Sequence, residues 1–166
     1  MVVCAREEKA SYPQMSSLRI TGKEQPFAAV SVPQDGGFVD SKILFSRLHD
    51  DSAIATLYIN RNRDNIKVTA HECGRVGLQL IKITGSSFAS FDRDHYTTLP
   101  EVQDRPLFIY LDVFWKYADI GNAINSDLCQ YIAPEQVRDL AQVVFHEFVS
   151  KSIQHLIHEM GIRLLN

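Results

Sequence analysis

The sequence is poor in cysteine, and its cysteines form no pattern that supports a disulfide framework or a zinc site. Cys4, Cys73 and Cys129 are odd in number, far apart and without a Cys-x-x-Cys spacing, so we expect reduced, partly buried thiols. Glycine-rich phosphate loops are also missing, since neither Gly-x-Gly-x-x-Gly nor Gly-Lys-Ser/Thr occurs. Nucleotide-phosphate cradles and nicotinamide or flavin folds are therefore not indicated.

The sequence also lacks an excess of charge of one sign and a long apolar run. Its 17 Lys and Arg residues stand against 20 Asp and Glu, and no concentrated basic face is visible for a nucleic acid or a membrane surface. The longest apolar runs are short segments such as 106–110, far below the roughly 20 residues that span a bilayer. With no signal-peptide pattern at the N-terminus, we expect a cytoplasmic protein without a nucleic-acid or membrane partner.

The length of 166 residues suits one domain with a sizeable core. We expect residues 51–166 to form that domain and residues 1–50 to add N-terminal strands or an arm. Within the first segment, 26–32 predicts a strand that ends in the turn 33–37, and 41–48 fits either a short helix or a strand. A flexible arm is the alternative.

Apolar alternation predicts strands in the middle of the chain. Residues 54–58 and 66–70 fit two strands joined by a polar turn, and 76–83 fits a further strand. Residues 107–117 are rich in aromatic and β-branched side chains and have strand length.

The last third of the chain changes to a helical period. Pro134 suits a first helical turn, and apolar residues recur on one face over 137–148 and again over 153–164. Ser150 and Ser152 lie between these sets and offer hydroxyls as helix caps. The order of elements predicts an α+β fold, in which two consecutive helices pack on one face of a mainly antiparallel sheet.

A long Ser/Thr-rich segment, 84–105, separates two of the predicted strands, and loops of this length in a compact domain are usually functional. It contains Gly-Ser-x-Phe-x-x-Phe, then Arg-Asp-x-Tyr-Thr-Thr-Leu-Pro-Glu and Asp-Arg, and Trp115 and Tyr117 follow. In this order and spacing the motifs resemble the corresponding loop of the urate oxidase (uricase) family. The resemblance runs from about residue 78 to 164, and Ser152-Ile153-Gln154 matches the family's Ser-Val-Gln. Residues 22–29 are loosely similar to a family strand whose two histidines are missing here.

The resemblance implies four ring-binding residues. Phe88 would stack on a planar heterocycle, the Arg105 guanidinium would fork onto its oxygen and nitrogen, and Gln154 would close the opposite edge. The backbone N–H of Ile153 would add one donor. An aromatic face, a bidentate cation, a carboxamide and a free N–H at a helix start suit a flat, amide-edged, weakly acidic ring such as a purine-dione anion. Other imide-like or pterin-like rings fit as well.

The resemblance also implies a fold and a reaction. The family contains two tandem tunnelling-fold (T-fold) units, and this chain resembles the second half, so the expected fold is T-fold-like. The expected activity is a urate oxidase-like oxidation of the ring by dioxygen, with no cofactor and no metal. The family's proton-relay Lys and Thr have no visible match. His95, Thr97 and Thr98 are the nearest candidates within the loop, and a homo-oligomer or a partner subunit is expected to complete the site.

Other interpretations stay open at this point. The chain could be a diverged cofactor-independent oxygenase or isomerase for another ring, or a non-catalytic ring-binding or structural remnant. Singly, Phe88 fits a core residue, Gln154 fits a solvated helix residue, and Arg105 fits an ion pair with Asp104 or Glu101. The histidines and glutamates of the two helices form no His-Glu-x-x-His, so His155 and Glu159 are expected to pair with each other instead of binding metal. The C-terminus is not a Ser-Lys-Leu address.

Overall fold

The computed structural model describes residues 12–34, 36–47, 49–63, 65–90, 92–124 and 130–166. It has an α+β fold of antiparallel sheets and helices, which confirms the predicted class. The chain forms two compact units, each built from two stretches of sequence. The first unit comprises Met1–Gly77 and Asp112–Tyr131, and the second comprises Leu78–Leu111 and Ile132–Asn166.

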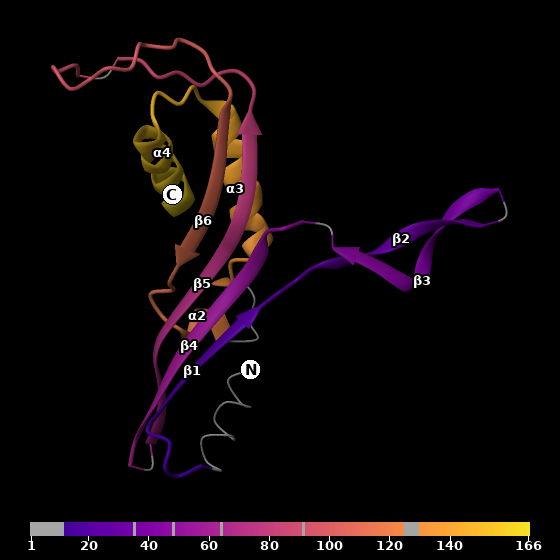
Figure 1. Cartoon of the computed structure of the whole chain (residues 1–166). Coiled ribbons are helices and arrows are strands. Elements are labelled where there is room, and N and C mark those ends of the chain that lie inside the picture. Colours follow the sequence, from indigo (N-terminus) through magenta and orange to yellow (C-terminus); the bar gives the residue numbers. More distant parts are fainter. Residues whose placement is uncertain (1–11, 35, 48, 64, 91, 125–129) are drawn as a thin grey trace. The chain divides into compact units, whose positions relative to one another are not determined.

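Four strands form the larger sheet, in the order β1-β4-β5-β6 (Figure 1). They are β1 (Ser17–Lys23), β4 (Ser52–Asn62), β5 (Asn65–Lys82) and β6 (Leu107–Trp115). β4 pairs antiparallel with both β1 and β5. β1 alternates in exposure along its whole length because its neighbouring side chains point to opposite faces of the sheet.

The first unit has its own small apolar core. Leu57 and Ile59 of β4 are buried, and five partly buried side chains from β1, β5 and the segment after β6 pack against them: Leu18, Ile20, Ile66, Val68 and Ile120. A short helix, α2 (Gly121–Ile124), also belongs to this unit. No sequence pattern predicted α2, since a single turn is too short to show a period.

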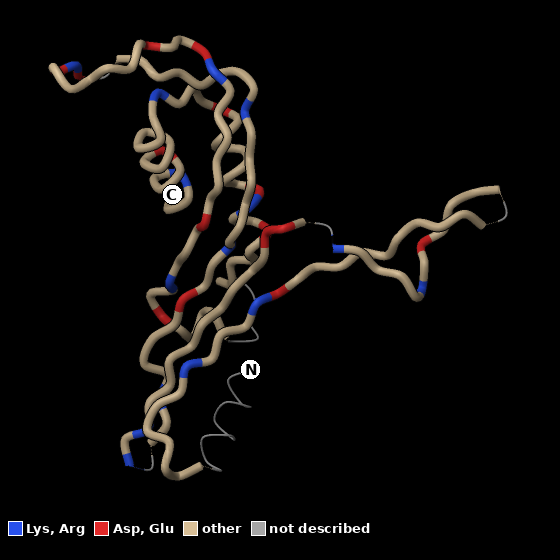
Figure 2. The backbone as a smooth tube through the Cα atoms, viewed as in Figure 1, with Lys and Arg blue, Asp and Glu red and all other residues tan. Residues whose placement is uncertain are grey.

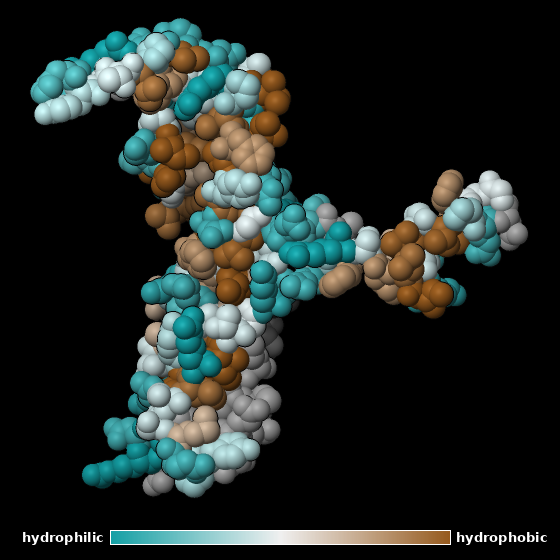
Figure 3. Space-filling model, in the orientation of Figure 1, coloured by the Kyte–Doolittle hydropathy of each residue, from teal (hydrophilic) through white to brown (hydrophobic). Residues whose placement is uncertain are grey.

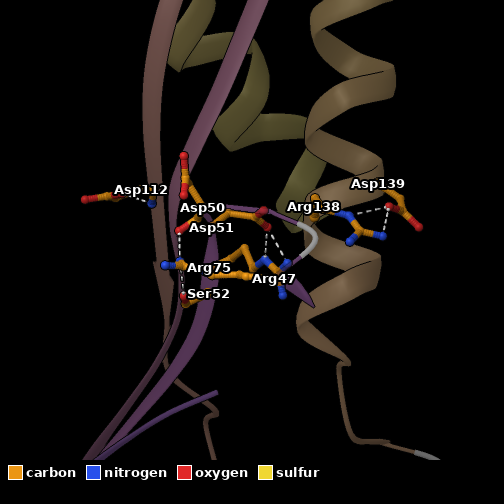
Figure 4. A network of polar contacts seen from close by, with 9 residues as sticks. Arg47, Asp50, Asp51, Ser52, Arg75, Asp112, Arg138 and Asp139 are labelled. Carbon is orange, nitrogen blue, oxygen red and sulfur yellow. Dashed lines mark hydrogen bonds and ion pairs between the residues drawn. The ribbon is translucent and has the colours of Figure 1, made fainter. Parts of the chain in front are cut away.

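A buried ion pair holds the start of β4 against β5 in the first unit (Figure 4). Arg75 is 1% exposed, and its Nε donates to Asp51 Oδ2 over 2.6 Å, with a second contact from Nη2. Asp112 of β6 accepts a hydrogen bond from the Gly77 N–H over 2.6 Å. The buried charges of Arg75 and Asp51 require each other because desolvation of an unpaired ion is costly.

The remaining strands of the first unit, β2 (Phe27–Gln34) and β3 (Gly37–Arg47), form an antiparallel hairpin. Neither strand contains a buried residue. Large apolar side chains are exposed on it, visible as brown surface over the hairpin in Figure 3: Phe27, Phe38, Val39, Ile43, Leu44 and Phe45. Lys and Arg are interspersed with Asp and Glu along the described backbone (Figure 2).

In the second unit, two helices pack on one face of the ends of β5 and β6, as predicted. They are α3 (Pro134–Glu147) and α4 (Ile153–Leu165). Ile109 of β6 is buried against them, whereas its neighbours Phe108 and Tyr110 are exposed, so the strand presents alternate side chains to the helices. The buried members of this core are Ile109, Val144, Phe145, Leu156 and Met160.

Both helices begin at the residues that the sequence indicated, Pro134 for α3 and the residue after Ser152 for α4. Pro134 is the first residue of α3, and the Gln136 side chain accepts a hydrogen bond from the Ala133 N–H over 3.1 Å. Ser152 caps α4, since its Oγ accepts from the His155 N–H over 3.1 Å. No helix among the described residues is long and apolar enough to cross a bilayer.

Two strand predictions need correction or completion. Residues 76–83 do not form a separate strand, because β5 continues without a break from Asn65 to Lys82. Gly77, at φ +78°, adopts the left-handed conformation within this strand, which glycine tolerates. The segment 41–48 is strand as far as Arg47, not helix, because it pairs with β2. The strand prediction for 26–32 is confirmed as β2.

The structure describes one of the three cysteines. Cys73 lies on β5 as a half-buried free thiol, and burial raises its pKa above the ordinary value, with a further contribution from the neighbouring Glu72 carboxylate. Cys4 and Cys129 lie outside the described residues.

Candidate functional site

The loop 83–106 joins β5 to β6 in the second unit, and its two ends are held together. We call residues 85–88 and 102–105 the loop base. Phe88 and Val102 exchange backbone hydrogen bonds of 2.7 and 2.9 Å as an antiparallel bridge. The Gly85 N–H donates to Asp104 Oδ1 over 2.8 Å, and Gly85 has a φ of +77°, which suits glycine. The base is therefore an ordered closure of the loop.

Ser86 and Ser87 connect the loop base to residues 149–152, the linker between α3 and α4. Ser150 Oγ lies 3.2 Å from Ser86 Oγ, the Ser87 N–H donates to the Ser150 carbonyl over 2.8 Å, and both Ser86 and Ser150 are 1% exposed. Ser86 O also accepts from the Arg105 N–H over 2.7 Å. Figure 1 shows the loop and the linker at the same end of the second unit. Three segments far apart in sequence thus meet at Ser86.

Phe88 and Arg105 lie side by side on this base. The Arg105 guanidinium carbon is 5.5 Å from the centre of the Phe88 ring, a distance at which a cation is attracted by an aromatic face. Arg105 Nε is buried and has no hydrogen-bond partner among the described residues. A buried donor without a partner costs stability. An oxygen or nitrogen acceptor placed beside Arg105 Nε would satisfy this donor.

The two acidic neighbours of Arg105 do not neutralise it. Asp104 accepts from the Gly85 N–H, and Glu101 Oε1 accepts from the Ser90 N–H over 3.2 Å. Within the described ranges, neither carboxylate forms an ion pair with Arg105, so the interpretation of this residue as a surface ion pair is wrong. Both carboxylates shape the loop backbone and leave the guanidinium fork to another acceptor.

Ile153 and Gln154 open the first turn of α4, three and four residues after Ser150. The Ser152 side chain accepts a hydrogen bond from the His155 N–H. The N–H groups of Ile153 and Gln154 lie at the start of the helix, where the first N–H groups have no intrahelical acceptor. Ile153 is 45% exposed, and the Gln154 side chain is exposed as well. Because Ser150 is bonded to the loop base, this helix start is tied to the same end of the unit as Phe88 and Arg105.

The loop tip, residues 92–100, is organised by its own local contacts. The Thr97 hydroxyl and the Tyr96 N–H both donate to Asp94 Oδ1 over 2.9 Å. These bonds, chiefly the one from Thr97, hold the pKa of Asp94 below its ordinary value. His95 and Thr98 are exposed, and the His95 ring lies 3.9 Å from that of Tyr96.

Several contacts that organise the site carried no signal in the sequence. Ser86 and Lys82 contact partners about 64 residues away, and no local pattern indicates these pairings. Ser150 and Ser152 were both offered as helix caps; Ser152 caps α4, whereas Ser150 bonds Ser86. The expected pairing of His155 with Glu159 is confirmed at 3.9 Å. Among the described side chains, no group of three or more His, Cys, Asp and Glu converges as a metal site.

The chain is similar in sequence to known proteins. The sequence model of the Uricase family matches residues 71–166. The chain is 41% identical over 155 residues to a uricase of Halalkalicoccus jeotgali, covering 93% of this chain and 51% of that protein. It is also 41% identical to a uric acid degradation bifunctional protein of Bacillus sp. strain TB-90, of which it covers 31%.

Solved structures give the same result for the fold. A crystal structure of the Bacillus sp. TB-90 urate oxidase superposes with a TM-score of 0.89 at 39% identity, over 99% of this chain and 54% of that one. The Bacillus subtilis urate oxidase gives 0.76 at 31% identity. The chain thus spans about half the length or less of the relatives it matches. Because the family model covers more than half of its residues and the fold agrees throughout, the chain belongs to the uricase family.

Proposed function

We propose that this chain supplies the ring-binding part of a urate oxidase-like, cofactor-free oxidoreductase. The observation that carries the proposal is Arg105, whose buried Nε has no partner and whose guanidinium lies 5.5 Å from the Phe88 ring. The similarity to uricases and urate oxidases supports urate as the ring, and other planar imide-type rings share its chemistry.

The four residues suit an anionic purine. Arg105 would donate two parallel hydrogen bonds to an oxygen and a nitrogen of the ring, which stabilises the anion. Phe88 would stack on the ring face and orient it. Gln154 offers a donor and an acceptor to the opposite amide edge, and the Ile153 N–H offers one more donor. An electron-rich anion held in this way can reduce dioxygen directly. Counted from the neutral ring, two electrons and two protons leave in all, the first proton when the anion forms, and dioxygen takes up two electrons and two protons to become hydrogen peroxide.

A second chain completes the site in this proposal. Ile153 and Gln154 are exposed and Phe88 is only half-buried, whereas oxidation of a charged ring requires a site from which water is excluded. A homo-oligomer, or a partner subunit, would cover the exposed side of the ring and contribute further groups. Sedimentation with and without urate tests this step, and a monomer that turns over urate would contradict it.

Proton transfer is assigned in the proposal to the loop tip, with His95, Thr97 and Thr98 as the candidates. Of the three, His95 has the type of side chain that most often acts as a general acid or base. Replacement of His95 by Ala should lower the turnover rate by about 100-fold, the usual size of a general acid-base contribution, and leave urate affinity unchanged. Equal turnover in both proteins would exclude His95 from proton transfer.

The decisive experiment separates binding from turnover. Urate affinity is measured under nitrogen, where oxidation cannot proceed, by thermal shift and by calorimetry. Dioxygen is then admitted, and its uptake is recorded together with the loss of urate absorbance. Binding with turnover supports the oxidase, binding without turnover indicates a ring-binding module, and turnover of another planar ring that depends on Arg105 indicates a diverged oxygenase or isomerase. Absence of binding to any such ring refutes the proposal.

A further inference from the structure

Lys82, the last residue of β5, contacts the end of a helix more than 60 residues later in the chain. Its ammonium donates to three carbonyl oxygens: those of Phe145 at 3.0 Å, His146 at 3.1 Å and Phe148 at 2.7 Å. An ammonium has three donors, so Lys82 uses its whole hydrogen-bonding capacity on the C-terminus of α3. Its Nζ also lies 5.8 Å from the centre of the Phe145 ring.

The end of α3 needs such a partner. The last carbonyls of a helix have no intrahelical donor, and helices commonly satisfy them with a glycine in the left-handed conformation. Here the C-cap is Phe148, which is extended at φ −128° and ψ 156°. Lys82 therefore replaces a backbone cap, and its charge opposes the negative end of the helix dipole.

The position of this cap relates it to the candidate site. Five residues separate Lys82 from Phe88 on one side of the contact, and four separate Phe148 from Ile153 on the other. Between the two sides, Ser86 and Ser87 bond to Ser150. Lys82 and the serine contacts are thus two successive ties between the strand that leads into the loop and the linker that leads into α4.

Gly85 gives room for the Lys82 side chain. A Cβ built on Gly85 would lie 3.0 Å from Lys82 Cε and 3.4 Å from Nζ. The same glycine turns the backbone at φ +77° into the loop base. The lysine and the glycine therefore share one small space beside the site.

We propose that Lys82 is a positioning residue of the ring site: by capping α3 it sets the place of the Ile153–Gln154 edge relative to Phe88 and Arg105. It touches neither the ring nor the reacting atoms in this arrangement. The inference rests on the proposed function, because it concerns the ring site. In this inference Lys82 keeps the Ile153–Gln154 edge at a constant distance from Phe88 and Arg105. Productive binding depends steeply on that distance.

The test compares Lys82→Met with Lys151→Ala, which removes one lysine from an exposed position of the linker. Lys82→Met keeps the apolar stem and removes the three donors. We expect its anaerobic urate affinity to fall by about 10- to 100-fold, as for a small misplacement of binding groups, while Lys151→Ala stays within about twofold because exposed charges contribute little. Equal affinities of Lys82→Met and the unsubstituted protein would overturn the proposal.

A double-mutant cycle distinguishes positioning from general loosening. If Lys82 acts through the edge made by Gln154, the effects of Lys82→Met and Gln154→Ala on urate affinity should be less than additive. With Phe88→Ala the effects should add. Additivity in both cycles would refute the assignment. Should Lys82→Met be too unstable to purify, Lys82→Gln, which keeps a donor but no charge, takes its place in the same cycles.

Hydrogen exchange gives a readout that does not need a ring. In Lys82→Met, the amides of Ser87 and His155, which bond to Ser150 and Ser152, should exchange about tenfold faster, as expected for local opening, while β6 amides are unchanged. Unchanged protection at both amides would overturn the proposal even if urate affinity fell. If the unsubstituted protein binds no urate, the proposed function fails, and faster exchange would still show that Lys82 positions this linker.

Discussion

The base and the tip of the loop 83–106 are built in different ways, although both contain residues that the family resemblance marks. The base is tied to the α3–α4 linker through the buried Ser86 and Ser150, and it holds Phe88 and Arg105. The tip is exposed, and hydrogen bonds among its described residues, such as that from Thr97 to Asp94, connect positions close in sequence. Long-range contacts thus define the ring-binding groups, and short-range contacts define the candidate relay groups.

The largest difference between base and tip should appear in urate affinity. Arg105→Ala removes the guanidinium fork, and we expect a loss of about 1.5–3 kcal/mol, or roughly 10- to 100-fold in Kd, as for hydrogen bonds to a charged group. Arg93→Ala removes the same charge from the tip, where Arg93 donates to the Leu99 carbonyl. Calorimetry under nitrogen should show a change of less than about twofold for this control. Equal losses in both variants would contradict the division.

The next effect concerns stability. Ser150→Ala leaves the buried Ser86 hydroxyl without its partner, which should lower the free energy of unfolding by about 1–3 kcal/mol. Thr98→Ala at the exposed tip should change it by less than about 0.5 kcal/mol, as is usual for surface positions. Urea denaturation followed by circular dichroism measures both. A larger loss from the tip substitution would reverse the comparison.

Glycine positions provide a pair of substitutions with opposite signs. Gly85→Ala places a Cβ at φ +77° and 3.0 Å from Lys82 Cε, so we expect destabilisation by about 1–2 kcal/mol from the left-handed conformation. Gly161→Ala in α4 meets no atom within 4 Å, and it should stabilise the protein by about 0.4–1 kcal/mol by restricting the unfolded chain. A thermal midpoint of Gly85→Ala that does not fall would show that the base tolerates the change.

The smallest effect is expected at the tip and depends on pH. The folded pKa of Asp94 is lowered by the Thr97 hydroxyl, so the turn is stabilised above the ordinary carboxyl pKa and loses this contribution as the pH falls through the lowered value. Thr97→Val should raise the pKa of Asp94 toward its ordinary value, measured by carbon NMR of the carboxyl group. Amide signals of the base should not follow this titration, and if they do, base and tip are coupled.

The fold could be predicted in part because local patterns carry it. The aromatic and β-branched composition of 107–117 and the helical period from Val137 are local signals, and the Ser152 cap lies next to the helix that it starts. The continuity of β5 could not be predicted, because residues 71–75 show no apolar alternation that would join the predicted strands 66–70 and 76–83. Pairing with β4 as far as Val76 keeps the strand intact. Strand β1 was missed for a similar reason: only its register with β4 makes its weak alternation meaningful.

The sequence by itself determined the α+β class, the helix boundaries near Pro134 and Ser152, and the motif that places the chain in the uricase family, since each depends on neighbouring residues or on fixed spacing. Only the tertiary structure decided that Ser86 bonds Ser150, that Lys82 caps α3, and that Arg105 keeps its guanidinium free of Asp104 and Glu101. These contacts join residues whose separation in the chain carries no periodic signal. Their energies depend on burial and on direction, which exist only after the chain has folded.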